Sequence, residues 1–223
     1  MSRLVRGALA APIAAAAVLG TVVAQADVAA GSTVAALWHM NETSGTTMVD
    51  SSGHGHNGTL HSVTLGASGF SGKAYTFNGS SSYVSVPNSA GLNPGSANIT
   101  ISFYLNTTSL PKSGDYDLVR KGAYPAQNYK VELLPSGQIM CTFQGSSSRH
   151  NATGGSGLNN GAWHHIQCIK TASQIQTVID GTVRATTSAT VGSISNTSAA
   201  DIGAHPGSDW YKGKLDEASI TIG

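Results

Sequence analysis

The chain has 223 residues, and only 10% of them are charged, with 12 Lys and Arg against 11 Asp and Glu. Proteins that bind nucleic acids or anionic membrane surfaces usually have a clear excess of basic residues. This chain has no such excess, so neither is an expected partner. Glycine is abundant at 27 residues, whereas glutamate occurs only at positions 42, 132 and 217. Helix formers are therefore scarce, which indicates an all-β protein.

The first 26 residues have the features of a secretory signal peptide. Arg3 and Arg6 form a basic start, and residues 8–24 are small and apolar. Ala24-Gln25-Ala26 then has the small-x-small pattern of a cleavage site. The alternative is a membrane anchor, but the apolar run is alanine-rich and contains Pro12. No second long apolar run follows, so we expect a secreted, extracellular protein without a membrane partner.

Short segments of alternating apolar and polar residues follow one another along the rest of the chain, without helical periods between them. The clearest is 99–105, where every second residue is apolar. Residues 41–58 are polar and glycine-rich and are expected to form a loop, and Asp180-Gly181 is a turn signal. The expected strands are 34–40, 74–77, 83–86, 99–105, 117–121, 129–134, 138–143, 163–170, 174–179, 182–185 and 213–222. This spacing predicts a two-sheet antiparallel jelly-roll sandwich over residues 30–223.

The chain has two cysteines, Cys141 and Cys168, and both lie inside expected strands. In an exported protein an even pair of cysteines indicates a disulfide. The alternative is two buried free thiols, which export disfavours.

Four short motifs occur in order along the chain. They are residues 50–59 (DSSGHGHNGT), 72–79 with 83–87, Trp163-His164-His165 with Asp180-Gly181, and 213–218. Together they resemble the motifs of the laminin-G-like, concanavalin A-like jelly rolls of secreted bacterial proteins. The resemblance implies binding of carbohydrate or protein ligands rather than a reaction. The cysteine pair also resembles a disulfide of many secreted members.

Calcium is the metal that we expect, in a structural role. The resemblance implies a calcium ion between the first and last strands, and such an ion needs oxygen ligands. Asp50 in its glycine loop, Asn78 at a strand end and Asp216 in the closing strand are the candidate ligands. The alternative is that Asp50 and Asn78 cap turns by hydrogen-bonding their own backbone.

Aromatic rings beside polar side chains are the usual means of holding a sugar. On this basis the candidate ligand-binding residues are Tyr116, Arg120, Tyr124, Arg149, His150 and Trp210. For Trp210 a second interpretation is open, in which its ring plugs the end of the sandwich.

Catalysis has little support in the sequence. A glycosidase needs two carboxylates about 5–10 Å apart, and no Glu-x-Asp-x-Glu cluster occurs; Asp115-x-Asp117 is the nearest pair. A lyase would need a Tyr or His base with Arg or Lys beside it, and these residues are scattered. Our leading hypothesis is a secreted, non-catalytic, lectin-like domain that binds carbohydrate, such as a polysaccharide. The alternatives are an extracellular protein-interaction domain and a polysaccharide lyase or hydrolase.

Overall fold

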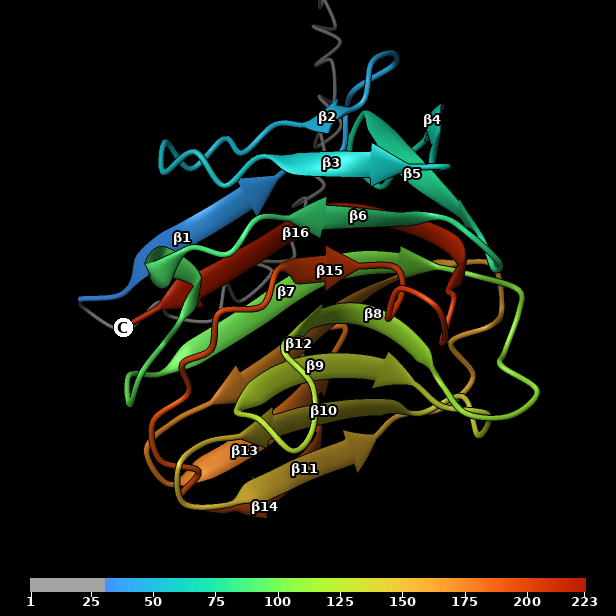
Figure 1. The fold of residues 1–223 in the computed structure, drawn as a ribbon. Helices are drawn as coiled ribbons and strands as arrows, with labels where there is room; N and C mark the ends of the chain where they lie inside the picture. The colour runs from blue at the N-terminus through green and yellow to red at the C-terminus, as the bar shows by residue number, and fades with distance from the viewer. Residues whose placement is uncertain (1–30) are drawn as a thin grey trace, which may run out of the picture.

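The computed structural model describes residues 31–223, which form two stacked antiparallel sheets (Figure 1). The expected signal peptide, residues 1–26, lies outside the described residues, as does residue 30 at the start of the expected domain. In the described part of the chain, no helix has the length and apolar character needed to cross a membrane.

The described chain consists almost entirely of short strands. In chain order the elements are β1 (Thr33–Trp38), β2 (Thr47–Met48), β3 (Gly58–His61), β4 (Thr64–Ser68), β5 (Lys73–Asn78), β6 (Tyr83–Val86), the 3-10 turn η1 (Ala90–Leu92), β7 (Ile99–Asn106), β8 (Tyr116–Lys121), β9 (Asn128–Leu133), β10 (Ile139–Gln144), β11 (Arg149–Gly154), β12 (Trp163–Lys170), β13 (Gln174–Ile179), β14 (Thr182–Ser188), β15 (Ala200–Ile202) and β16 (Lys212–Ile222).

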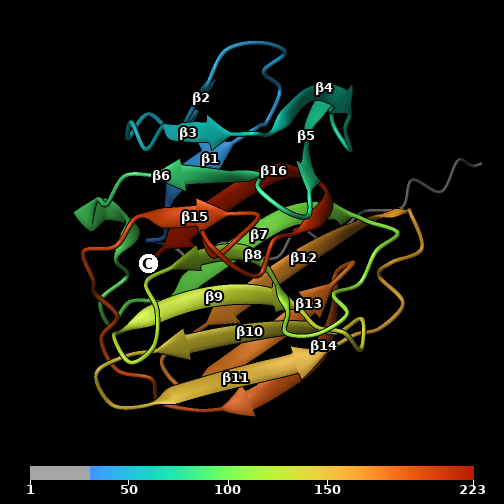
Figure 2. The same cartoon turned by 45° about the vertical axis from the view of Figure 1, so that its right-hand side comes forward.

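The strands divide into two layers, which we call sheet A and sheet B. Sheet A has the order β14-β13-β12-β7-β16-β5-β4, with β1 also paired to β16. Sheet B has the order β11-β10-β9-β8-β15-β6-β3-β2. Figure 2 shows the two layers lying face to face, with β8 to β11 in front of β12 to β14. The predicted all-β, two-sheet antiparallel jelly roll is therefore confirmed.

The core lies between the sheets and follows from the alternation seen in the sequence. Along β7 the four residues Ile99, Ile101, Phe103 and Leu105 are all buried. On the opposing sheet, β9 and β10 contribute their own alternate residues to the same cluster: Tyr129, Val131, Leu133, Ile139, Cys141 and Phe143. Burying one large apolar side chain contributes roughly 1.5–3 kcal/mol, so this two-residue period decides which face of each strand turns inward.

The last strand, β16, joins the two ends of the described chain. It pairs with β7 on one side; on the other, its first residues pair with β5 and its last residues with β1. The first and last strands of the described chain are therefore hydrogen-bonded neighbours. The predicted turn at Asp180-Gly181 is also present, because both residues have positive φ angles (51° and 72°) between the paired strands β13 and β14. This is the backbone geometry of a tight hairpin turn.

Sequence patterning missed β2, β3, β4, β11 and β15. β2 lies inside the expected loop 41–58, and Gly58 at the end of that loop begins β3. β15 has three residues, and β11 (RHNATG) buries only Ala152 and Gly154. Such segments carry too few apolar residues to show a period, and they become strands because a neighbouring strand pairs with them.

The two cysteines form a disulfide that links the sheets. Cys141 lies in β10 of sheet B and Cys168 in β12 of sheet A, and their Cα atoms are 5.5 Å apart. The predicted disulfide is confirmed, and the alternative of two free thiols is wrong. The bond closes a segment with a sequence separation of 27 residues.

Removing this disulfide should destabilise the fold. Closing a loop of this length stabilises a protein by ~3.5 kcal/mol in the chain-entropy model. The double variant C141A/C168A should therefore lose about that free energy of unfolding, measured by urea denaturation. Adding a reductant to the double variant is the control and should have no further effect. An unchanged unfolding midpoint would mean that the bond does not constrain the unfolded chain.

Candidate functional site

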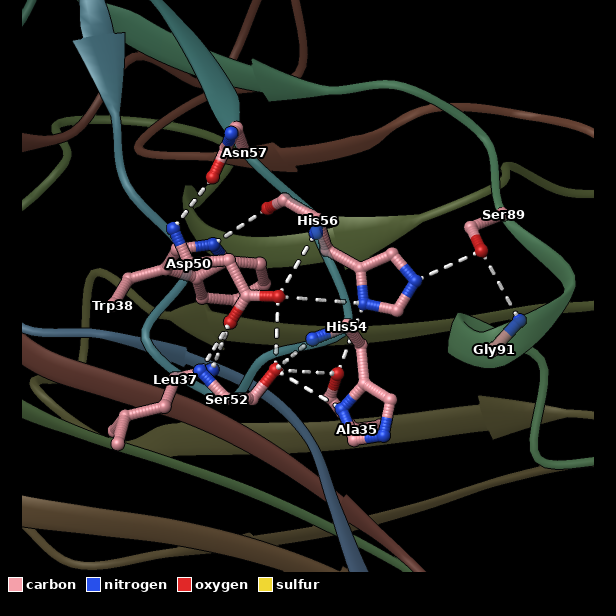
Figure 3. A network of polar contacts seen from close by, with 10 residues as sticks. All are labelled: Ala35, Leu37, Trp38, Asp50, Ser52, His54, His56, Asn57, Ser89 and Gly91. Carbon is pink, nitrogen blue, oxygen red and sulfur yellow. Dashed lines mark hydrogen bonds and ion pairs between the residues drawn. The ribbon is translucent and has the colours of Figure 1, made fainter.

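Asp50, the first predicted calcium ligand, lies at the centre of a network of hydrogen bonds (Figure 3). Its Oδ1 accepts from the backbone N–H groups of Leu37 (3.0 Å) and Ser52 (2.9 Å). Its Oδ2 accepts from the Ser52 hydroxyl and the His56 N–H, both at 2.8 Å. Burial raises the pKa of Asp50, but these hydrogen bonds outweigh burial and lower it below the usual range.

The same loop is anchored to β1 and η1 through His56. Its Nδ1 lies 2.9 Å from the Ala35 carbonyl oxygen, and its Nε2 lies 2.8 Å from the Ser89 hydroxyl. The Trp38 indole donates to the His56 carbonyl at 2.8 Å. Since every partner is part of the protein scaffold, this network holds the first strand to the loop that follows it (Figure 3).

The other two predicted calcium ligands lie in different strands of sheet A, at the end of β5 and within β16. The Asn78 side-chain oxygen accepts the N–H groups of Ser80 and Ser81, each at 2.9 Å, in the turn after β5. Asp216 is buried in β16 and accepts from Ser71 N–H at 2.9 Å. Burial, together with the neighbouring Glu217 charge, raises the pKa of Asp216 to about 6.

These contacts do not fit a calcium ion held by Asp50, Asn78 and Asp216 together. Among the described residues, neither aspartate belongs to a group of three His, Cys, Asp or Glu side chains whose ligand atoms lie within 4.8 Å of one another. The oxygens of Asp50 and Asn78 face N–H and O–H donors, as in the turn-capping alternative. Calcium at these residues stays an untested prediction.

A different group of polar residues lies on the outer face of sheet B, which is the face turned away from sheet A. These residues line a cavity of about 230 Å³, which we call the Arg120 cleft. Strands β8, β9 and β11 and two loops supply its lining: Arg120, Ala123, Tyr124, Asn128, Lys130, Arg149, His205 and Asp209. A second cavity of about 240 Å³, which reaches Asp201 of β15, shares Arg120, Ala123 and His205.

Three of the six predicted ligand-binding residues meet in this cleft: Arg120, Tyr124 and Arg149. The Tyr124 ring is 71% exposed. The Arg149 guanidinium carbon lies 5.8 Å from the centre of that ring, within cation–π range. The cleft therefore combines the exposed Tyr124 ring with the Arg149 guanidinium, while Arg120 and Asn128 are buried and donate to the Gly122 and Ala126 carbonyl oxygens.

The structure does not bring Tyr116 and His150 to the cleft. Tyr116 packs its ring edge-on against Tyr211 on the inner side of sheet B. His150 is opposite Phe143, a core residue, so it lies on the inner side of β11. Adjacent residues of a strand point to opposite faces, which is why Arg149 reaches the cleft and His150 does not.

Trp210 lies at the other side of the same outer face. Its ring is half-buried and packs edge-on against Tyr83, with centroids 5.9 Å apart, and Tyr83 stacks on His61 at 4.2 Å. Trp210 is thus part of an aromatic row over β3 and β6. It does not act as a plug in the core, where Tyr211 is the buried residue.

A β-bulge in β8 brings Asp117 and Arg120 to the same face. Asp117 is opposite Glu132 and Arg120 is opposite Lys130, but the register shifts between Asp117 and Val119. Residues three apart point to opposite faces of a regular strand, and the extra residue of a bulge reverses this relation. The Arg120 guanidinium therefore forms an ion pair with the Asp117 carboxylate.

Carboxylates crowd the outer face beside the cleft. Asp117 is 1% exposed and Glu132 is 0% exposed, and Lys130 pairs with Glu132. Burial raises the pKa of Asp117 to about 6, opposed by the charges of Arg120 and Lys130. Burial raises the pKa of Glu132 as well, with contributions from the charges of Asp115 and Asp117.

The loop between β15 and β16 covers this part of β8. Gly203 N–H donates to Leu118 O at 3.0 Å, and Asp117 N–H donates to Asp209 O at 3.0 Å. Gly203 has a φ angle of 85°, and an added Cβ would lie 2.2 Å from a Phe77 ring carbon, so only glycine fits. The loop thereby places His205 and Asp209 over Asp117.

Sequence reasoning missed Lys130, Glu132, Asp201, His205 and Asp209 as parts of this site. Alternation places Lys130 and Glu132 on the outer face of β9, but Glu132 is the only carboxylate of its segment and gives no paired-carboxylate signal. If the expected strands 117–121 and 129–134 are taken as an antiparallel hairpin, Lys130 and Glu132 lie beside the polar residues of β8, and the sequence could have indicated this part of the site. His205 and Asp209 carried no such signal, because only the folded loop brings them there.

The carboxylates do not form an accessible glycosidase pair. Asp117 and Glu132 are cross-strand neighbours, but both are buried and paired with Arg120 and Lys130. A glycosidic oxygen does not reach them in this conformation.

Comparison with known proteins supports the fold. The family model described as "Concanavalin A-like lectin/glucanases superfamily" matches residues 78–221. A search of curated protein sequences found no match. The binding domain of Paraclostridial Mosquitocidal Protein 1 has a similar structure, with a TM-score of 0.69 and 17% identity over 84% of this chain and 48% of that one. The present chain thus spans about half the length of that domain.

Two further solved structures resemble this chain in fold. Domain 4 of AbnA, a GH43 extracellular arabinanase from Geobacillus stearothermophilus, was solved with arabinotriose. It has a TM-score of 0.66 and 19% identity over 86% of this chain and 93% of that one. The LG4-5 domains of the mouse laminin alpha1 chain have a TM-score of 0.53 and 16% identity over 66% of this chain and 40% of that one. At such identities the likeness concerns the fold alone.

Replacing Asp50 tests its scaffolding role. The variant D50N should lose about 1–3 kcal/mol of unfolding free energy at pH 7, because its NH2 group faces N–H donors. The pKa of Asp50 in the folded protein lies below its ordinary value of 3.8, so the stabilisation is complete above that value and is lost as pH falls through the folded pKa. Urea unfolding at pH 7 and pH 3 measures both effects.

The control for this substitution is D209N, which removes the same charge from a loop aspartate whose side chain accepts a hydrogen bond from the Ser208 hydroxyl. We expect a change below about 1 kcal/mol for D209N. Equal stability of D50N and the parent chain at pH 7 would contradict the role assigned to Asp50.

Proposed function

Because this chain belongs to the concanavalin A-like lectin/glucanases superfamily, as its four motifs predicted, we propose that it is a secreted, non-catalytic, lectin-like domain that binds carbohydrate. The Arg120 cleft is the binding site in this proposal. The observation that carries it is the 71% exposed ring of Tyr124 at a cavity that Arg120, Asn128 and Arg149 also line.

The chemistry of the cleft suits a saccharide. An exposed aromatic ring such as Tyr124 covers the apolar face of a sugar, and a guanidinium such as that of Arg149 donates to its hydroxyl or carboxylate oxygens. A larger depression of about 760 Å³ shares Arg149 and is lined by Ser, Thr, Asn and Gln residues of neighbouring loops. A chain of several sugar units has room to extend there from the cleft.

The extracellular location is supported by two features. The first 26 residues have the pattern of a signal peptide, and Cys141 and Cys168 form a disulfide. Disulfides persist in oxidising compartments and are rare in the cytosol. The arabinanase domain solved with arabinotriose shows that a similar fold holds a carbohydrate in another protein.

A second candidate function is an interaction with an extracellular protein, and one surface favours it. On the outer face of sheet A, Phe70 is 52% exposed and stacks on Tyr104 (3.6 Å), which stacks on His165 (4.6 Å). We call this row the Phe70 ladder. An exposed apolar ring on a stacked support is typical of a protein contact as well as of a sugar platform.

A polysaccharide panel tests the carbohydrate proposal and separates the two surfaces. The parent chain should bind at least one neutral or uronate-containing glycan, and Y124A and R149A should each weaken binding about tenfold or more, since a lost ring or charged contact is worth roughly 1–3 kcal/mol. The control F70A removes an exposed ring from the Phe70 ladder and should bind as the parent does.

Stability is expected to stay within about 0.5 kcal/mol in all three variants, because the residues are at the surface. The absence of glycan binding, with and without calcium, would refute the proposal. Loss of binding in F70A alone would move the site to the Phe70 ladder, and capture of a purified protein partner lost in F70A would favour the second function.

A further inference from the structure

Two carboxylate oxygens beside the Arg120 cleft are buried without a hydrogen-bond partner. They are Oδ1 of Asp115 and Oδ1 of Asp117, among the described residues. Asp117 is only 1% exposed. An unsatisfied buried carboxylate oxygen is costly, and a water molecule or a metal ion is the kind of partner that satisfies it.

The neighbouring carboxylates have the spacing of a chelating group. One side-chain oxygen from each of Asp115, Asp117 and Glu132 lies within 4.8 Å of the other two. Oxygens bound to a single calcium ion lie 2.3–2.6 Å from it, so they are at most about 5 Å apart. The spacing of these three side chains therefore meets the distance requirement for a shared ion, with Glu132 also accepting from Lys130 and from the Thr142 hydroxyl.

The balance of charge also favours a cation at this point. The carboxylates of Asp115, Asp117 and Glu132 face two positive side chains, Arg120 and Lys130, each engaged in an ion pair. Asp209 adds a further carboxylate next to Asp117. Uncompensated negative charge in a buried site is unfavourable, and a divalent cation removes it.

We propose that Asp115, Asp117 and Glu132 bind a calcium ion on the outer face of sheet B. All three ligands are carboxylates, which suit a hard cation such as calcium rather than zinc. The bulge at Leu118 and the pairing of Asp117 with Glu132 build the site. Calcium binding here does not depend on carbohydrate binding, so either proposal stands if the other fails.

A second acidic group shares Asp117 and supplies a matched control. Asp117, His205 and Asp209 also have ligand atoms within 4.8 Å of one another. Asp115 belongs only to the proposed site, whereas Asp209 belongs only to this second group. Both are partly exposed loop residues, so neither substitution should prevent folding.

Calcium titration of the purified chain, by calorimetry and by displacement of terbium luminescence, is the test. The parent chain should bind one calcium ion per molecule. D115N and E132Q should each weaken binding at least tenfold, while D209N should stay within about threefold. No binding by the parent chain, or equal loss in D115N and D209N, would overturn the proposal.

Thermal unfolding separates this site from the loop of residues 50–59. Calcium should raise the melting temperature of the parent chain by several degrees over that in chelator, because a ligand that binds only the folded state stabilises it. D50N should keep this increase and D115N should lose it. The reverse result would place calcium at Asp50 and refute the site proposed here.

Discussion

The pairing of β16 is the constraint on which the rest of the structure depends. This strand pairs with β7 on one side and with both β5 and β1 on the other, so it closes sheet A from the two ends of the described chain. Such pairing over nearly the whole chain is long-range and must overcome a large loop-closure entropy. The disulfide from β10 to β12 then ties sheet A to sheet B.

The candidate site is a consequence of this closure. The loop that leads into β16 crosses the outer face of sheet B, where backbone hydrogen bonds join it to β8 at Asp117 and Leu118. It brings His205 and Asp209 to the same place as the β8–β9 carboxylates. The bulge in β8 positions the remaining residues of the site, because it places Asp117 on the same face as Arg120 and Glu132. The buried charges here are held by ion pairs within β8 and within β9 rather than by solvent.

The loop of residues 50–59 illustrates how one sequence pattern supports two interpretations. An aspartate in a glycine loop fits a calcium ligand and a turn cap equally well, because both roles use carboxylate oxygens. The contacts of Asp50 with Leu37, Ser52 and His56 are those of the cap. The proposed calcium site instead uses Glu132, which as a single glutamate in an apolar strand gave no metal signal in the sequence.

The amino-acid sequence by itself determined the all-β class, the inward faces of the long strands, the Asp180-Gly181 turn and the cysteine pairing, because each depends on local periodicity, local backbone preference or the presence of only two cysteines. Only the tertiary structure decided which polar residues meet. It brings three of the candidate ligand-binding residues, Arg120, Tyr124 and Arg149, to one cleft, whereas Tyr116 and His150 point inward. The bulge, the edge strand β11 and the loop over β8 set these directions, and all three depend on pairing between segments far apart in the chain, which local pattern does not encode.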